Sequence, residues 1–456
     1  MESTLVTDRP GSYILRIVGA PSTTRIPVHY ALLIDNSGSM GEDGKLENVK
    51  RCIRAMLDIL NENDMLSIVT FESASEIILP PTYNTSANKA HIASVIEKIR
   101  PENMTNLSAG LGNVRAVLST AASIQTHIKT GVLILTDGHV NQGVIDVDQL
   151  KAITRNIQDT CAGLTIQCIG YGNDHNSALL KDISIETQGS YNIVNTIEDV
   201  ATAFGDSLGG LMSCVAQNVV VELPVGSVVL GPMPVPVPVP VPTAGADNVL
   251  KVGDIYADTE KMILYTVPQS TPPHTVQVRG MILPLLTPIV QTVTPTQLTE
   301  RVIDIELTRH RYTCATLLRE IAIGPSTAFL ACRDRIEEFK SALADTAYDG
   351  NPIAAQLRAE VRVLEEGLTV HADTTVINQH ISYFGLGRGF STPSNRQGGH
   401  QYASHSLVYT QAIDEDSDPD YEDQDPQNHR SVTTSVFQNP TQRMLSSNLR
   451  SASQHP

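Results

Sequence analysis

The chain has 456 residues, a formal net charge of −17 and an aromatic content of 4% without tryptophan. This length is sufficient for about two or three hydrophobic cores. The excess of acidic side chains argues against a protein that binds nucleic acid through a basic surface. No run of about eighteen apolar residues occurs, so we expect no membrane-spanning helix. The first residues, Met1–Thr4, do not begin a secretory signal, and six cysteines in such a chain are sparse. Together these features favour a reducing, intracellular (cytoplasmic) setting.

Strand and helix patterns alternate over residues 27–213. Apolar runs predict buried strands at 30–34, 66–71, 132–135, 164–169 and 191–194. Apolar spacings of three and four residues predict helices at Lys45–Leu60, Asn88–Ile99, Leu107–Ala121, Asp146–Gln158, Ser177–Thr187 and Thr196–Ser213. Strands that alternate with helices of this length are typical of βαβ units. We therefore predict an α/β fold with a doubly wound, mostly parallel sheet.

The first of these strands ends in Asp35-Asn36-Ser37-Gly38-Ser39. A carboxylate followed by two hydroxyls supplies hard oxygen ligands, which Mg²⁺ prefers. The carboxyl ends of parallel strands are also where open α/β sheets bind ligands. A simpler alternative is that Asp35 caps the following helix and that the serines form a turn.

The pattern Asp-x-Ser-Gly-Ser on a buried strand resembles the start of the metal-ion-dependent adhesion site of von Willebrand factor A domains. In that family, a threonine on a second loop and an aspartate on a third loop complete the metal shell. Thr105 precedes the predicted helix at Leu107–Ala121, and Asp137 follows the strand at 132–135, so both match by type, order and context. The resemblance covers residues 27–213 and implies a Rossmann-like domain that binds Mg²⁺ or Mn²⁺. Its ligands would be Asp35, Ser37, Ser39, Thr105 and Asp137.

Two carboxylates and three hydroxyls leave a divalent ion electrophilic, with waters that it can exchange. An Asp or Glu side chain of a protein partner can then complete the octahedron, so we expect an intracellular binding module or scaffold. We expect no enzyme, because the sequence contains no nucleophile–base pair, no Gly-Lys-Ser phosphate loop and no zinc-like spacing. His139 and His175 follow strand ends, and each is either a contact at the rim of the site or a solvated loop residue.

The stretch Phe204–Ser213 resembles the last helix of intracellular von Willebrand A proteins, which include RING-type and U-box ubiquitin ligases. The chain has no Cys-x-x-Cys pair, so a RING is absent. The alternative function is therefore that of a non-catalytic, accessory component of a ubiquitin-ligase-type assembly.

Short strands interrupted by proline and glycine follow and predict a β-sandwich over 214–308, to which Tyr13–Val18 of segment 1–26 adds a strand. Its strands are expected at Val215–Glu222, Val249–Ala257, Lys261–Val267, His274–Ile282 and Arg301–Leu307. The alternating Val-Pro run at 232–242 predicts an extended arm. This arm is either a docking ligand for an aromatic groove or a stiff loop.

Helical spacing predicts a small bundle over 309–370, with helices at Tyr312–Ile323, Thr327–Ala344 and Asn351–Leu368. Residues 371–456 form a low-complexity acidic tail, and from about Ser391 we expect disorder, since little apolar surface is available to bury. Within it, Asp414–Asp425 carries eight acidic residues and no basic one. Such a run is either an interaction tail or a solvated segment.

Overall fold

The computed structural model describes most of the first 361 residues and two short segments beyond them. The described ranges are 1–22, 25–102, 104–125, 128–161, 163–172, 175–187, 189–230, 249–268, 273–298, 302–323, 328–351, 353–355, 357–359, 361, 392–393 and 440–454. The Val-Pro run, the acidic run and most of the helix expected at Asn351–Leu368 lie outside these ranges.

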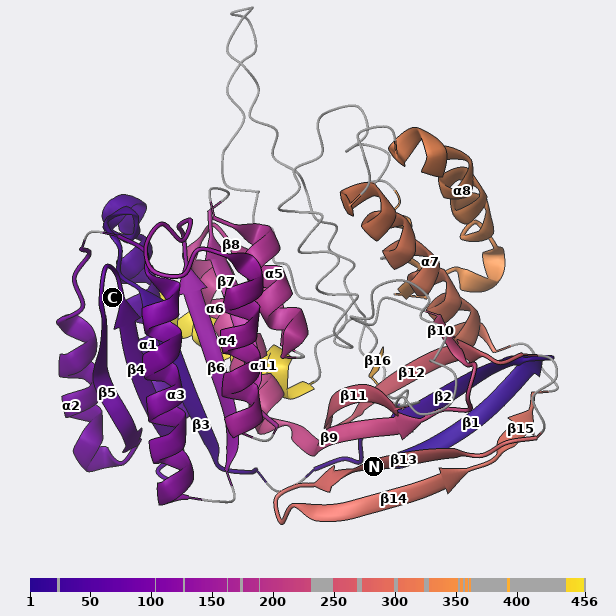
Figure 1. Ribbon diagram of the computed structural model, residues 1–456, viewed down its shortest axis with the longest axis horizontal. Coiled ribbons are helices and arrows are strands. Elements are labelled where there is room, and N and C mark those ends of the chain that lie inside the picture. Colours follow the sequence, from indigo (N-terminus) through magenta and orange to yellow (C-terminus); the bar gives the residue numbers. More distant parts are fainter. Residues whose placement is uncertain are drawn as a thin grey trace, which may run out of the picture.

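A six-stranded sheet in the order β5-β4-β3-β6-β7-β8 forms the centre of the first part of the molecule (Figure 1). Five strands are parallel, and the edge strand β5 is antiparallel to β4. The strands are β3 (Val28–Asp35), β4 (Met65–Phe71), β5 (Ser75–Tyr83), β6 (Lys129–Thr136), β7 (Thr165–Tyr171) and β8 (Tyr191–Val194). The predicted doubly wound, mostly parallel α/β sheet is thereby confirmed.

Helices cover both faces of this sheet, because successive side chains of each strand point to opposite faces. Along β3, Tyr30 and Leu32 belong to one core and Ala31 and Leu33 to the other. The first core is closed by α1 (Lys45–Ile59), α2 (Ser86–Glu97) and α6 (Ile197–Met212). The second is closed by α3 (Leu107–Ile124), α4 (Val147–Thr160) and α5 (Ser177–Glu186). Strands apolar on both faces are what a covered parallel sheet requires.

Two mainly antiparallel sheets form a sandwich beside this layer (Figure 1). One contains β10 (Val228–Leu230), β12 (Thr259–Thr266), β2 (Ser12–Val18), β1 (Glu2–Arg9) and β15 (Pro295–Gln297), and β16 (Thr392–Pro393) also pairs with β12. The other contains β11 (Val249–Tyr256), β9 (Cys214–Glu222), β13 (Val276–Ile282) and β14 (Thr287–Val293). Their facing side chains form one core that includes Leu15, Ile17, Val219, Val221 and Tyr265.

The helices α7 (Ile303–Ile323) and α8 (Ala328–Ala342) follow the sandwich. The strand expected at Arg301–Leu307 is wrong, since residues 303–307 are the first turns of α7. The pattern there alternates over too short a stretch to separate strand from helix. Packing decides: Ile305 and Tyr312, two turns apart, both lie against the outer face of the β2/β12 sheet.

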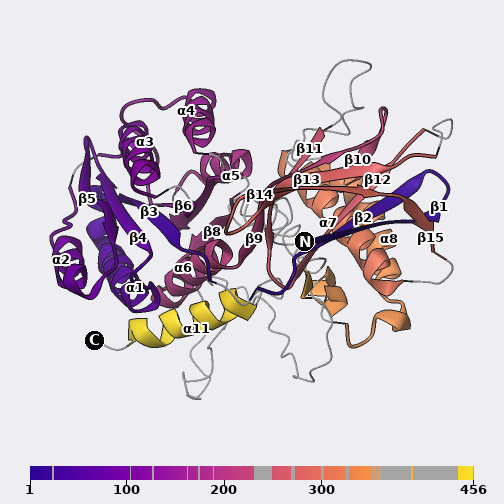
Figure 2. The same ribbon diagram turned by 90° about the horizontal axis from the view of Figure 1, so that it is seen from below.

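The C-terminal segment differs from its expected disorder. Residues Pro440–Gln454 form the helix α11, whose Leu445 and Leu449 are buried in the same core as α1 and α6. Figure 2 shows this helix, in yellow, lying along α1 and α6. The sequence also did not lead us to β1, β5, β10, β14, β15 or β16. In β5, Pro80 and Pro81 argue against a strand, but they are tolerated because β5 lies at a sheet edge.

Candidate metal centre

Three loops at the carboxyl end of the α/β sheet carry the predicted ligands. Asp35 is the last residue of β3, and Asp137 directly follows the neighbouring parallel strand β6. Thr105 lies just before α3, whose first residue is Leu107. Parallel pairing of β3 with both β4 and β6 brings the ends of these strands to one edge. The fold therefore places the three loops next to one another.

Four of the five predicted residues are joined by hydrogen bonds. The backbone N–H of Ser37 donates to Asp35 Oδ1 at 2.8 Å, and the hydroxyls of Ser37 and Ser39 are 3.2 Å apart. The Ser39 hydroxyl donates to Asp137 Oδ1 at 2.8 Å. The other carboxylate oxygen of Asp35 accepts a hydrogen bond from the hydroxyl of Thr136. Asp35 is fully buried, and burial raises its pKa to about 6.

Thr105 faces the same space across Gly138. A Cβ at Gly138 would lie 3.2 Å from Thr105 Oγ1 and 3.9 Å from Asp35 Oδ2. Because Gly138 has no side chain, room remains between the loop of Thr105 and the loop of Asp137. The backbone N–H of Thr105 donates a hydrogen bond to Asn141 Oδ1 at 2.9 Å, which helps to fix the position of Thr105. Oxygen donors from two carboxylates and three hydroxyls beside this small space fit the hard-ligand preference of Mg²⁺ and Mn²⁺.

Sequence reasoning missed Lys45, the first residue of α1. Its ammonium lies 2.6 Å from Asp137 Oδ2 and donates to the backbone oxygen of Ser39 at 3.5 Å. Burial opposes its charge, but the hydrogen bond and the charge of Asp137 raise the pKa of Lys45 overall. The Asp137 side chain is fully buried, so this ammonium is its neighbouring countercharge. No local signal marked Lys45, because the contact spans 92 residues.

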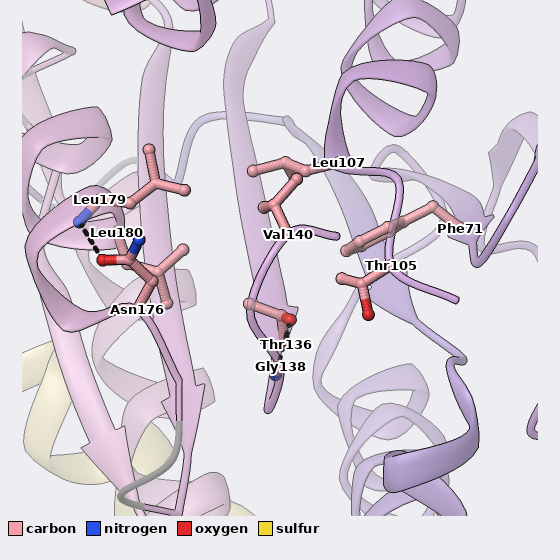
Figure 3. Close-up of a pocket in the computed structure, with 9 residues that line it drawn as sticks. All are labelled: Phe71, Thr105, Leu107, Thr136, Gly138, Val140, Asn176, Leu179 and Leu180. Carbon is pink, nitrogen blue, oxygen red and sulfur yellow. Dashed lines mark hydrogen bonds between the residues drawn. The ribbon is translucent and has the colours of Figure 1, made fainter. Parts of the chain in front are cut away.

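A small hollow borders the centre (Figure 3). It shares Thr105, Thr136 and Gly138 with the candidate site. Its other lining residues are mostly apolar, namely Phe71, Leu107, Val140, Asn176, Leu179 and Leu180. Apolar side chains offer a cation no ligand, and the Oδ1 of Asn176 accepts a hydrogen bond from the backbone N–H of Leu179 at 3.1 Å. The candidate ligands therefore lie at one wall of the hollow.

The two histidines have different environments. His139 is exposed, as a solvated loop residue would be. His175 is buried, and its Nε2 is hydrogen-bonded to the hydroxyl of Tyr191 against Gly170. It is therefore a packed side chain, and the description as a solvated residue is wrong for His175.

Comparison with known proteins identifies the α/β layer that carries this centre. The model of the von Willebrand factor type A domain family matches residues 31–205, which include all five predicted ligands. These residues form a von Willebrand factor type A domain. Type A domains are a family of protein-interaction modules, and divalent cations are common ligands of them. The type A domain here comprises the α/β layer.

Among curated proteins, YfbK of Escherichia coli is 28% identical over 195 residues, which are 42% of this chain and 32% of YfbK. The Synechocystis protein sll0103 is 26% identical over 53% of this chain and 57% of its own length. The E3 ubiquitin-protein ligase WAV3 of Arabidopsis thaliana is 25% identical over 53% of this chain and 30% of the ligase. The chain thus spans between about a third and somewhat over half of the length of these relatives.

Solved structures extend the similarity beyond the type A domain. A von Willebrand factor type A protein from Catenulispora acidiphila has a TM-score of 0.56 and 15% identity, covering 83% of this chain and 93% of that one. The ArnB paralog VWA2 from Sulfolobus acidocaldarius has a TM-score of 0.50 and 14% identity, covering 84% and 97%. At such identities, the likeness concerns the fold.

Three further observations concern the cysteines, the possible metal-binding clusters and the apolar character of the helices. None of the six cysteines is in a disulfide. Within the described ranges, no three His, Cys, Asp or Glu side chains gather as a metal cluster. The helices that the structure describes include none of sufficient length and apolar character to cross a bilayer.

Proposed function

We propose that this protein is an intracellular binding module or scaffold that holds a partner's Asp or Glu carboxylate through a divalent cation. The observation that supports this most strongly is the hydrogen-bonded group of Asp35, Ser37, Ser39 and Asp137 at the ends of two adjacent parallel strands. With Thr105 these residues would hold Mg²⁺ or Mn²⁺. Helix capping by Asp35 accounts for none of the contacts that reach Asp137.

The chain's own residues prepare the site in two ways. Ser37 and Thr136 each donate a hydrogen bond to Asp35, which holds its carboxylate in one orientation. Ser39 does the same for Asp137. A bound cation would supply an electrophilic centre for a carboxylate of the partner. Binding, without bond making or breaking, is the activity that such a group supports, so we propose no catalysis by this site.

A second function has a specific observation in its favour. The matches to WAV3 and WAVH1 of Arabidopsis thaliana, both named E3 ubiquitin-protein ligases, cover 53% and 31% of this chain but only 30% and 23% of those proteins. The shared part would then be the binding part of such an assembly. In that case the protein is an accessory, non-catalytic component that selects or positions a partner.

The first test measures the cation directly. In calorimetric titrations with Mg²⁺ and Mn²⁺, the full chain should bind one ion, and Asp35→Ala should bind none, because a buried carboxylate ligand is lost. Glu42→Gln is the matched control, since it removes a charge from the exposed turn beside the site. Unchanged titration of Asp35→Ala would exclude the assignment, provided that its thermal melting shows an intact fold.

The second test concerns the partner. Affinity capture from a cell extract should recover a partner with Mg²⁺ and lose it with EDTA or with Asp35→Ala. A ubiquitin ligase or its substrate among the Mg²⁺-dependent partners would favour the accessory role. Partners that are retained equally in Mg²⁺, in EDTA and by the mutant would show that binding does not use the cation.

A further inference from the structure

The face of the type A domain formed by α6 and α1 is covered by α11, a helix from the far end of the chain (Figure 2). The nearest described residue before it, Pro393, is separated from Pro440 by 46 residues (394–439). Leu445 and Leu449 of α11 are 3% and 0% exposed. A segment so remote in sequence thus supplies buried apolar surface to a domain that is otherwise built from consecutive residues.

The surface of α6 is shaped for this helix. A Cβ on Gly205 would fall on the backbone of Ser446, and one on Gly209 would lie 2.7 Å from the Cα of Gln442. Real Cβ atoms essentially never approach other atoms so closely, so both glycines are required for the two helix backbones to meet. Only a helix with small or unbranched side chains at the crossing, here Ser446 and Gln442, can approach α6 so closely.

Polar groups are matched across the same contact. Asp206 lies between the two glycines, and its carboxylate accepts a hydrogen bond from Ser446 Oγ at 3.1 Å. Its backbone oxygen accepts one from Gln442 Nε2 at 3.0 Å. Gln442 and Ser446 are 4% and 0% exposed, so these hydrogen bonds are shielded from water. Buried polar groups that are paired in this way define the register of the two helices.

Charge is complementary as well. The segment 440–454 contains two arginines and no acidic residue, in a chain whose net charge is −17. The facing helix α6 carries Glu198, Asp199 and Asp206. Arg450 interacts electrostatically with Asp206 and Asp199. The contact therefore has the features of a recognition site for a short cationic helix: a backbone cradle, matched hydrogen bonds and opposite charge.

The side of α6 that contacts the sheet is a different one. Ser207 is hydrogen-bonded to Tyr30 of β3, and Leu211 lies against Gly131 of β6. Residues 205, 206 and 209 point instead to α11. The attachment of α6 to its sheet thus does not require α11. A helix of about 15 residues is barely stable alone in water, so α11 depends on its contact with α6 and α1 to stay helical.

We propose that the α6–α1 face is a helix-docking site whose occupant is the chain's own segment Pro440–Gln454, bound as a separable ligand. The docked helix holds segment 440–454 against the type A domain. Its release exposes the surface of α6 at Gly205 and Gly209. A tethered ligand has an effective concentration on the order of millimolar, so an added helix must reach that range to compete.

Hydrogen exchange of the full chain, followed by mass spectrometry, tests this. Gly205→Leu should remove the cradle and lower the protection of 440–454 about tenfold or more while β3 and β6 stay protected. Leu449→Asp should have the same effect from the other side of the contact. Gly112→Leu is the matched control, because a Cβ at Gly112 of α3 meets nothing within 4 Å. Joint loss of protection in α11, β3 and β6 in both variants would overturn the proposal.

Competition in trans is the decisive measurement. A synthetic peptide of residues 440–454, carrying a heavy-isotope label, should lower protection of the chain's own α11 at millimolar concentration, and less so at high salt. The same peptide with Leu449→Asp should fail, and the chain with Gly205→Leu should not bind the wild-type peptide. Absence of any competition at several millimolar would show that α11 is a fixed part of the domain and would overturn the proposal. A dimer that dissociates on dilution together with loss of α11 protection would assign the occupant to a second copy and overturn the proposal.

Discussion

At the scale of single residues, the candidate metal centre includes a positively charged side chain, that of Lys45. The ammonium of Lys45 lies 2.6 Å from Asp137 and is largely buried, at 17% side-chain exposure. The carboxylates of the two proposed ligands, Asp35 and Asp137, and one ammonium leave the centre with a formal charge of −1. A divalent ion would raise this to +1, which attracts a carboxylate. Without Lys45, the loaded centre would be neutral.

We therefore predict opposite effects of Lys45→Met on metal and partner. Metal affinity should rise about tenfold, because one unit of positive charge a few ångströms from a divalent ion opposes its binding by about 1–2 kcal/mol at high dielectric. Binding of the partner's carboxylate should weaken. Calorimetry with Mg²⁺ measures the first effect, and Lys45→Arg, which keeps the charge, is the control. Equal metal affinity of all three proteins would exclude an electrostatic role for Lys45.

At the scale of elements, β3 combines the site with a buried histidine. His29 is fully buried, and its Nε2 lies 2.9 Å from the hydroxyl of Ser67 on β4. Its Nδ1 has no hydrogen-bond partner among the described residues. Burial lowers the pKa of His29 to about 4. The folded state thus resists protonation of His29 where the unfolded chain accepts a proton near pH 6.5.

As the pH falls from about 6.5 to 4, the unfolded state gains a proton that the folded state lacks, so about 3 kcal/mol of stability should be lost. In His29→Gln, urea denaturation at a series of pH values should give a flatter dependence in that window. His91→Gln, at an exposed histidine, is the control. An unchanged slope in His29→Gln would contradict this assignment.

At the scale of the whole molecule, a buried ion pair joins the type A domain to the sandwich. Lys129 of β6 is 2.6 Å from Asp254 of β11, with side-chain exposures of 0% and 10%. Thr165 of β7 donates to the same carboxylate at 3.1 Å. Burial opposes the charge of Lys129, but Asp254 raises its pKa overall. Removal of one partner would leave an uncompensated charge at this junction.

We expect Lys129→Met to lower the free energy of unfolding by about 3–5 kcal/mol, as broken buried pairs do. The double variant Lys129→Met/Asp254→Leu should recover most of this, because no buried charge then remains unpaired. Lys89→Met is the control, since Lys89 and Asp58 form an exposed pair 3.6 Å apart that should contribute at most about 0.5 kcal/mol. Equal losses in the single and double variants would show that packing, and not charge, joins the two parts.

The sequence by itself predicted the α/β layer, which the structure confirms, and it was also the source of the five proposed ligands. Buried strands such as β3 are apolar on both faces, and amphipathic helices alternate with them. Local periodicity was therefore sufficient to predict the fold of this layer. Asp35, Ser37 and Ser39 are close in sequence. Thr105 and Asp137 were assignable because each occupies a loop defined by its flanking element. The strength of these local signals explains why the six helices of the layer were predicted to within a few residues.

Contacts between remote segments were decided only by the tertiary structure. The ion pair of Lys45 with Asp137 and the docking of α11 on Gly205 and Gly209 join residues 92 or more positions apart. Segment 440–454 is too polar to predict order from composition, and its two buried leucines acquire their role only against the α6 surface. The start of α7 was likewise set by the sheet on which Ile305 packs. In each case the stabilising partner lies outside the window within which a local pattern can be recognised.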